Sequence, residues 1–239
     1  MPLPRSRAAD CERIRVTQTT GDHTPEERRN ARVILNRLVK LYPNVTTALA
    51  YDEPWQLLIS TVLSAQTTDE NINKVAPVLF GRYPTPADLA GAKPEDVEKI
   101  IFSTGYYRQK TKSIIALSGD LVDTYDGEVP STLEELVMLP GVGRKTASVV
   151  LAEVWNLPAI AVDTHVKRVM KRLGITSFTD PEKVERDLRE LYPQDRWSDI
   201  SMTVIQFGRD VCDAKRPRCW ECPLRDRCAF EDKAVGPHH

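Results

Sequence analysis

The chain has 239 residues, a formal net charge of −1, 41% hydrophobic residues and 28% charged residues. These values are those of an ordinary soluble globular protein with one large or two modest domains. No apolar run approaches the roughly eighteen residues that a membrane-spanning helix needs, and no apolar signal segment follows the N-terminal arginines, so we expect a cytoplasmic protein. Because the net charge is near zero, any nucleic-acid surface must come from local concentrations of basic residues.

Residues 1–23 mix proline, arginine, threonine and glycine without an apolar period, and this composition predicts a flexible N-terminal extension. A helix is expected directly after it, because Thr24 and Glu27 form a capping box around a proline at the first helical position. Apolar residues then recur at helical spacing. We expect this first helix to end before Pro43.

The most apolar helix of the chain is predicted at residues 54–63, and we place it at the centre of a core. The segment that follows, residues 64–69, is small and polar. Thr68 or Asp69 can cap the next helix. Taken by itself, Gln66 is an ordinary loop glutamine.

Two short helices are predicted at residues 86–91 and 94–102. A turn at residues 103–108 then leads into a long helix that ends near Tyr125. Tyr106 lies on this turn, where packing at the helix start is the ordinary role of an aromatic residue.

A helix-hairpin-helix follows. Ser131 and Glu134 form a second capping box, and a Pro-Gly-Val-Gly turn separates two apolar helical runs. We expect Gly141 and Gly143 to supply unusual backbone angles and to let a ligand approach bare amide groups. The amides that open the second helix make a seat for phosphate, and Lys145 is expected about one turn into that helix.

Lys145 and Asp163 are candidates for chemistry. An amine is a nucleophile only when it is unprotonated, and the positive end of a helix disfavours a further positive charge, so a lysine there can attack a sugar carbon and form a Schiff base. Asp163 begins another predicted helix, and its carboxylate can stabilise an oxocarbenium-like charge or move a proton. The ordinary alternatives are a phosphate contact for Lys145 and a helix N-cap for Asp163, and the residue types alone favour them.

Further helices fit residues 164–173, 181–192 and 198–214, and no segment alternates with period two. The sequence therefore predicts an all-α protein.

Four of the five cysteines, Cys212, Cys219, Cys222 and Cys228, are crowded into 17 residues. Four thiolates at this spacing can surround one metal centre, and a cytosolic context argues against disulfides. Structural zinc usually takes two pairs with short spacers and only one Cys-x-x-Cys is present, whereas a 4Fe–4S cluster accepts longer and unequal spacers. From the residue types alone, both zinc and an iron–sulfur cluster stay open.

Basic residues are concentrated in two places. One group runs from Arg144 to Arg172, and by itself it is best explained as a solvated helix face. The other lies among the cysteines and includes Lys215, Arg216 and Arg218. A metal centre would hold these three side chains in register with phosphates.

The hairpin at residues 139–147, the segments 162–165 and 63–69, and the cysteine run that ends at Cys228 together resemble the endonuclease III family of DNA glycosylases. The motifs occur in the family's order and cover roughly residues 25–230. The x6, x2, x5 cysteine spacing is that of the family's cluster loop.

This resemblance implies two helical domains with a DNA-binding cleft between them. Residues 47–157 would form a six-helix barrel with the hairpin, and residues 24–46 and 158–239 a discontinuous domain that ends in the 4Fe–4S loop. Lys145 would lie on one wall of the cleft and Asp163 on the other.

The resemblance also assigns residues to DNA. Gln66 would enter the gap left by an extruded base, and Tyr106 takes the place of a hydrophobic wedge, where it can stack on the orphaned base. The remaining expected DNA contacts are Gly141, Gly143, Arg144, Lys215, Arg216 and Arg218.

The implied function is that of a bifunctional DNA glycosylase and AP lyase for oxidised pyrimidines in damaged duplex DNA. We expect one 4Fe–4S cluster, no nucleotide cofactor, no membrane, a monomer, and a cytoplasmic protein that joins the nucleoid on DNA. The alternatives are a monofunctional glycosylase of the same superfamily and a non-catalytic DNA-binding module. The chain departs from the family at Phe207, where a histidine is common, and has Thr61 where adenine glycosylases of the superfamily carry a catalytic glutamate.

Overall fold

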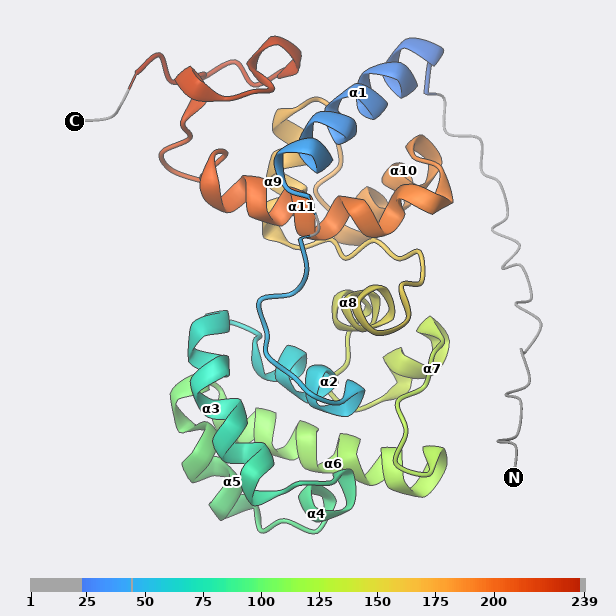
Figure 1. Ribbon diagram of the computed structural model, residues 1–239, viewed down its shortest axis with the longest axis vertical. Coiled ribbons are helices and arrows are strands. Elements are labelled where there is room, and N and C mark those ends of the chain that lie inside the picture. The colour runs from blue at the N-terminus through green and yellow to red at the C-terminus, as the bar shows by residue number, and fades with distance from the viewer. Residues whose placement is uncertain (1–22, 44, 237–239) are drawn as a thin grey trace, which may run out of the picture.

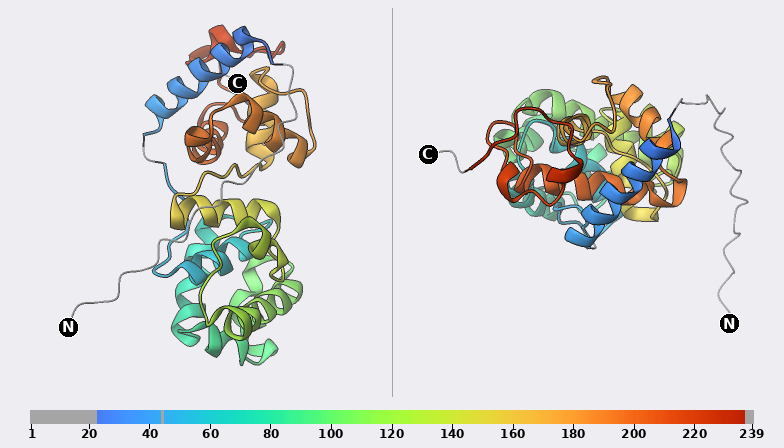
Figure 2. Two further views of the ribbon diagram at one scale, coloured as in Figure 1. Left: turned by 90° about the vertical axis from the view of Figure 1, so that its right-hand side faces the viewer. Right: turned by 90° about the horizontal axis from the view of Figure 1, so that it is seen from above.

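The computed structural model describes residues 23–43 and 45–236, and every regular element in that part of the chain is a helix. The prediction of an all-α protein is therefore confirmed. The extension expected at residues 1–23 lies, apart from His23, outside the described residues. None of the described helices is both long and apolar enough to cross a membrane. The helices form two groups, one above the other in Figure 1 and also in the left view of Figure 2.

The first group is built around its most apolar helix, as predicted. Eight of the ten residues of α2 are buried, and α2 contacts α3, α6 and α8. The group consists of α2 (Pro54–Leu63), α3 (Asp69–Arg82), α4 (Pro86–Ala90), α5 (Pro94–Ile101), the 3-10 turn η1 (Phe102–Thr104), α6 (Tyr107–Tyr125), α7 (Leu133–Met138) and α8 (Arg144–Trp155).

The second group combines the first helix of the chain with its last ones. Its members are α1 (Pro25–Leu41), α9 (Thr164–Arg172), α10 (Pro181–Leu191), η2 (Gln194–Arg196) and α11 (Trp197–Asp210), followed by a cysteine loop with the short turns η3 (Cys219–Glu221) and η4 (Arg225–Arg227). α11 packs against both α1 and α9. Phe207, the departure from the family's histidine, is 1% exposed in this core.

Each group has its own hydrophobic core. The core of the first group takes its buried residues from Leu49 to Ala159, and that of the second from Ala31 to Leu38 and from Ile160 to Leu224. We therefore propose that residues 47–157 form one domain, and residues 24–46 with 158–239 the other.

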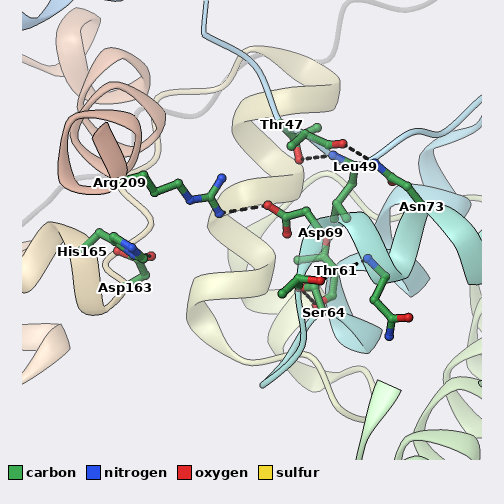
Figure 3. A network of polar contacts seen from close by, with 12 residues as sticks. Thr47, Leu49, Thr61, Ser64, Asp69, Asn73, Asp163, His165 and Arg209 are labelled. Atoms are coloured by element: carbon green, nitrogen blue, oxygen red, sulfur yellow. Dashed lines mark hydrogen bonds and ion pairs between the residues drawn. The ribbon is translucent and has the colours of Figure 1, made fainter. Parts of the chain in front are cut away.

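Ion pairs join the two groups of helices. Arg144 of α8 donates from Nε and Nη2 to the two carboxylate oxygens of Glu185 in α10, at 2.6 and 3.0 Å, and Arg189 pairs with the same carboxylate at 2.7 Å. The Glu185 side chain is only 5% exposed, so the two guanidinium groups offset the cost of burying its charge. A second pair, Arg209 of α11 with Asp69 of α3 at 2.9 Å, is drawn in Figure 3.

One helix start differs from the prediction. The capping box of Thr24 and Glu27 is confirmed at α1, but the cap of α7 is Thr132, not Ser131, and it accepts from the Glu135 amide. Residues 131–134 and 132–135 both have the Ser/Thr-x-x-Glu pattern, so the sequence alone does not choose between them.

Candidate functional site

The hairpin between α7 and α8 contains two glycines, and the backbone conformation requires glycine at only one of them. Gly141 has a φ of +79°, and a Cβ there would lie 2.8 Å from the Ser113 Cβ, so a side chain is excluded on both counts. Gly143 differs from the prediction, because its φ of −89° and ψ of 168° are ordinary extended backbone. Its role is different: it is the N-cap of α8 and brings no side chain to cover the helix start.

Lys145 is the second residue of α8, closer to the helix N-terminus than the full turn expected. The first N–H groups of a helix have no partner within the helix, and they give this end a partial positive charge. The Lys145 side chain is exposed. The structure therefore places a reachable amine beside bare backbone donors.

Asp163 is the N-cap residue of helix α9. Its Oδ1 accepts from the Val166 amide at 2.8 Å, so the cap that was its ordinary alternative is present. Its Oδ2 lies 3.0 Å from His165 Nδ1, and the Asp163 side chain is 16% exposed. One oxygen thus fixes the helix start while the carboxylate stays accessible. His165 was missed from the sequence; the Asp-x-His spacing at a helix start is the signal that points to it.

Figure 3 shows how this site relates to the contact between the domains. Asp163, His165 and Arg209 lie in the second group of helices, and Asp69 and Ser64 face them from the first group. The hydrogen bond from Arg209 to Asp69 connects the two groups at this point. Cavities of about 920 and 1070 Å³ are found beside α1, and neither is lined by Lys145 or Asp163. The DNA-binding cleft therefore stays a prediction.

Gln66 and Tyr106 share an unusual backbone conformation. Their φ angles are +60° and +49°, a left-handed geometry that costs a non-glycine residue roughly 1–2 kcal/mol. Both side chains are exposed, Tyr106 by 69%. A residue held in such a conformation needs support from its surroundings, and it often marks a functional position.

Arg144 was predicted as a DNA contact, and the structure gives its guanidinium another partner. The bidentate pair with Glu185 links α8 to α10, so a phosphate would compete with a buried carboxylate for the same donors. A DNA role for Arg144 stays a prediction.

The four predicted cysteine ligands lie in the loop that follows α11. All four are free thiols of intermediate exposure. Arg172 of α9 holds the loop by donating to the carbonyls of Asp213 and Ala214 at 2.6 and 2.9 Å, and its Nη1 lies 3.5 Å from Cys212 Sγ. Burial raises the pKa of Cys212, and it raises the pKa of Cys222 to about 11. A nearby cationic metal centre is what turns such thiols into thiolates.

The spacing of the sulfur atoms tests zinc against a cluster. Among the described residues, no three of the four cysteine sulfurs lie within 4.8 Å of one another. Four thiolates on a single zinc ion lie roughly 3.8 Å apart, as follows from the zinc–sulfur bond length and a tetrahedral geometry. The choice between zinc and a 4Fe–4S cluster stays a prediction of the cysteine spacing.

The three predicted basic contacts of this loop are not equivalent. Lys215 and Arg216 are exposed, and their amides both donate to Asp213 Oδ1 at 2.8 Å, which fixes the turn that presents them. Arg218 instead pairs with Glu221 at 3.0 Å and donates to the Asp210 carbonyl. Lys215 and Arg216 are thus the better candidates for phosphate contacts.

Comparison with known proteins gives consistent matches over most of the chain. Residues 59–194 match the HhH-GPD superfamily of base excision DNA repair proteins, and residues 212–228 match the iron–sulfur binding domain of endonuclease III. The endonuclease III of Synechocystis sp. is 49% identical over 203 residues, which cover 84% of this chain and 93% of the relative. The endonuclease III of Escherichia coli is 39% identical over 200 residues, which cover 84% and 95%.

This chain belongs to the endonuclease III family.

Solved structures agree with that assignment. A trapped endonuclease III–DNA covalent intermediate with an estranged adenine has a TM-score of 0.81 and 43% identity, covering 84% of this chain and 95% of that one. A thermostable thymine-DNA glycosylase, 21% identical with a TM-score of 0.74, shares the fold. The match at residues 212–228, a segment that contains the four cysteines, supports an iron–sulfur cluster in this protein. Thr61 is buried and donates to its own helix at the Leu57 carbonyl, so it offers no acid at the position that adenine glycosylases use.

Proposed function

We propose that this chain is a bifunctional DNA glycosylase and AP lyase that removes oxidised pyrimidines from duplex DNA and nicks the resulting abasic site, in base excision repair. The observation that carries the proposal is the combination of an exposed Lys145 at the uncovered N-terminus of α8 with the accessible carboxylate of Asp163 at the N-cap of α9. A relative 43% identical to this chain is a trapped covalent intermediate with DNA, the species that an amine nucleophile gives.

The first chemical step exchanges a base for an amine. The damaged nucleotide leaves the helix stack, which costs a few kcal/mol and least for a weakly paired base. Lys145 Nζ then attacks C1′ of the sugar, the bond from C1′ to the base breaks, and the base leaves with a proton. The Asp163 carboxylate offsets the positive charge that develops on the sugar.

The second step cuts the strand. The sugar ring opens, so that Lys145 and C1′ form a Schiff base. This iminium makes the C2′ proton acidic; its removal and the breakage of the C3′–O bond give β-elimination. Water then releases the lysine.

Contacts to the DNA backbone are proposed from the same elements. The amides around Gly141 and Gly143 would hold a phosphate, and Lys215 and Arg216 would neutralise others. The affinity should therefore fall steeply with salt despite the net charge of −1. Gln66 and Tyr106 would fill the space that the damaged nucleotide leaves. We further propose that the protein acts as a monomer in the cytoplasm and on the nucleoid.

One 4Fe–4S cluster on Cys212, Cys219, Cys222 and Cys228 is proposed to make the basic loop rigid. Cys219→Ser is expected to lose the visible iron–sulfur absorbance and the bound iron, and to lower Tm by at least about 5 °C, because metal binding contributes directly to folding. Cys11→Ser, at the one cysteine outside the loop, is the matched control and should keep both. Iron content and thermal unfolding measure the effect, and an unchanged iron content in Cys219→Ser would reject the ligand assignment.

Borohydride trapping tests the proposed function. Borohydride reduces a Schiff base to a stable amine, so wild-type protein mixed with a duplex that contains one abasic site should give a covalent adduct that migrates more slowly on a denaturing gel. Peptide mapping of the adduct should find the DNA on Lys145. If iron-loaded wild type binds this duplex but gives no adduct, the lyase is excluded, and the protein is a monofunctional glycosylase or a binding module.

A further inference from the structure

Lys110 of α6 is a buried lysine that pairs with no carboxylate of the described residues. Its side chain is one of the most enclosed charged groups described, with the residue 6% exposed. Its Nζ donates to two backbone carbonyls, Leu63 O at 2.8 Å and Thr104 O at 2.6 Å. Burial lowers the pKa of this lysine. A buried amine is costly, so its retention calls for an explanation beyond packing.

The two carbonyls end two different elements. Leu63 is the last residue of α2, and Thr104 is the last residue of η1. Carbonyls at a helix end have no partner within the helix and need a donor from elsewhere. Lys110 supplies one donor to each, and so it joins segments that lie about forty residues apart in the sequence.

Asn71 of α3 makes a second bridge between the same segments. Its Nδ2 donates to Thr67 Oγ1 and to the Ser103 carbonyl, both at 3.1 Å, and Ser103 Oγ donates to Asn71 Oδ1 at 3.2 Å. Lys110 therefore holds the carbonyls of Leu63 and Thr104, and Asn71 holds their neighbours Thr67 and Ser103.

The joined segments are the turns that carry Gln66 and Tyr106. Gln66 lies three positions after Leu63, and Tyr106 lies two positions after Thr104, so each closely follows a carbonyl that Lys110 binds. Each has the left-handed backbone described above, which persists only where neighbouring groups hold it. The bridges connect the two turns to each other and to helices α3 and α6.

We propose that Lys110, together with Asn71, is a positioning residue that couples the Gln66 and Tyr106 turns into one rigid unit, so that both side chains enter the DNA in a fixed relative position. This inference rests on the proposed function, because it concerns how the same site opens duplex DNA. Lys110 touches neither the substrate nor the reacting atoms, and it acts through the two turns.

The test replaces Lys110 by methionine, which keeps the length and apolar volume of the side chain and removes the donors. Single-turnover release of an oxidised pyrimidine from duplex DNA should slow about tenfold, the size expected when hydrogen bonds to a charged group are lost. Lys93→Met is the matched control, because Lys93 is an exposed lysine at the N-cap of α5, and its rate should equal that of wild type.

A double-mutant cycle separates positioning from a general loss of stability. In a Gln66→Ala, Tyr106→Ala background, adding Lys110→Met should change the release rate by less than about twofold, because the groups that it positions are gone. 2-Aminopurine placed opposite the lesion should show the same pattern in its fluorescence, which reports unstacking of the opposite base. Full additivity of the rates would overturn the proposal.

Further measurements distinguish misfolding of a variant, failure of the proposed function and failure of the positioning role. Thermal unfolding identifies a variant that does not fold, and in that case Asn71→Ala takes the place of Lys110→Met with the same expected pattern. If wild type gives no borohydride adduct and releases no base, the proposed function fails. If wild type does both and each variant matches Lys93→Met, the positioning role alone is rejected.

Discussion

Lys145→Gln is expected to abolish base release and strand nicking together, by at least about a thousandfold in single-turnover rate, because both steps use the same nitrogen and an amide nitrogen is not a nucleophile. The Lys145 side chain is exposed at the start of α8, so its replacement should alter the free energy of unfolding by less than about 0.5 kcal/mol. Lesion-containing duplex should still bind, with a salt dependence that is shallower by about one phosphate contact.

Lys145→Arg is the matched control for charge. Arginine keeps the positive charge and the phosphate contact but stays protonated, so this variant should bind DNA like wild type and still lack chemistry. Rates of base release and nicking, measured on one lesion-containing duplex with binding followed separately, give the comparison. Nicking by Lys145→Gln at a rate near that of wild type would show that another amine is the nucleophile.

Asp163→Asn is expected to slow base release by about 10²–10⁴-fold, the usual range for loss of a positioned acid–base group. Asparagine caps helices as well as aspartate does, so the hydrogen bond from the Val166 amide is retained. What disappears is the negative charge that faces the developing cation on the sugar. The fold should therefore stay intact while the rate falls.

Asp163→Ala separates the cap from the charge. This variant removes both, so its rate of base release should fall as in Asp163→Asn. Its free energy of unfolding should also fall by about 0.5–2 kcal/mol, the cost of a lost N-cap. Chemical denaturation and single-turnover kinetics on the two variants provide the measurements. A wild-type rate for Asp163→Asn would reduce Asp163 to a structural cap.

Local patterns in the sequence were sufficient for most of the fold. The capping box of Thr24 and Glu27, the apolar run of α2 and the glycine turn before α8 each depend on neighbouring residues, and the structure has all three. The cap of α7 was predicted one residue early because two overlapping segments fit one pattern. Helix α11 ends at Asp210, four residues before the predicted end, where the cysteine loop takes over.

Features that depend on distant residues were beyond the sequence. The Arg144–Glu185 pair joins residues that are 41 positions apart in the sequence. A basic residue at a helix start does not indicate that it will pair with a buried carboxylate from a distant segment. Nothing in the sequence distinguishes Lys110 from other helical lysines, because its two acceptors are backbone carbonyls that no side-chain pattern marks. The left-handed φ of Gln66 and Tyr106 was not predicted either, since neither residue type favours it.

The second group of helices, which combines α1 with the last helices of the chain, has a consequence for synthesis on the ribosome. Ile34, Leu35 and Leu38 of α1 are buried against elements that follow residue 160, and roughly 120 residues separate the end of α1 from the start of α9. At about 5–20 residues per second, the apolar face of α1 remains uncovered for on the order of ten seconds. The helices of the first group, α2 to α8, all emerge during that interval. Helix α1 is thus synthesised before the helices that bury it, and its apolar face stays exposed to water until they emerge.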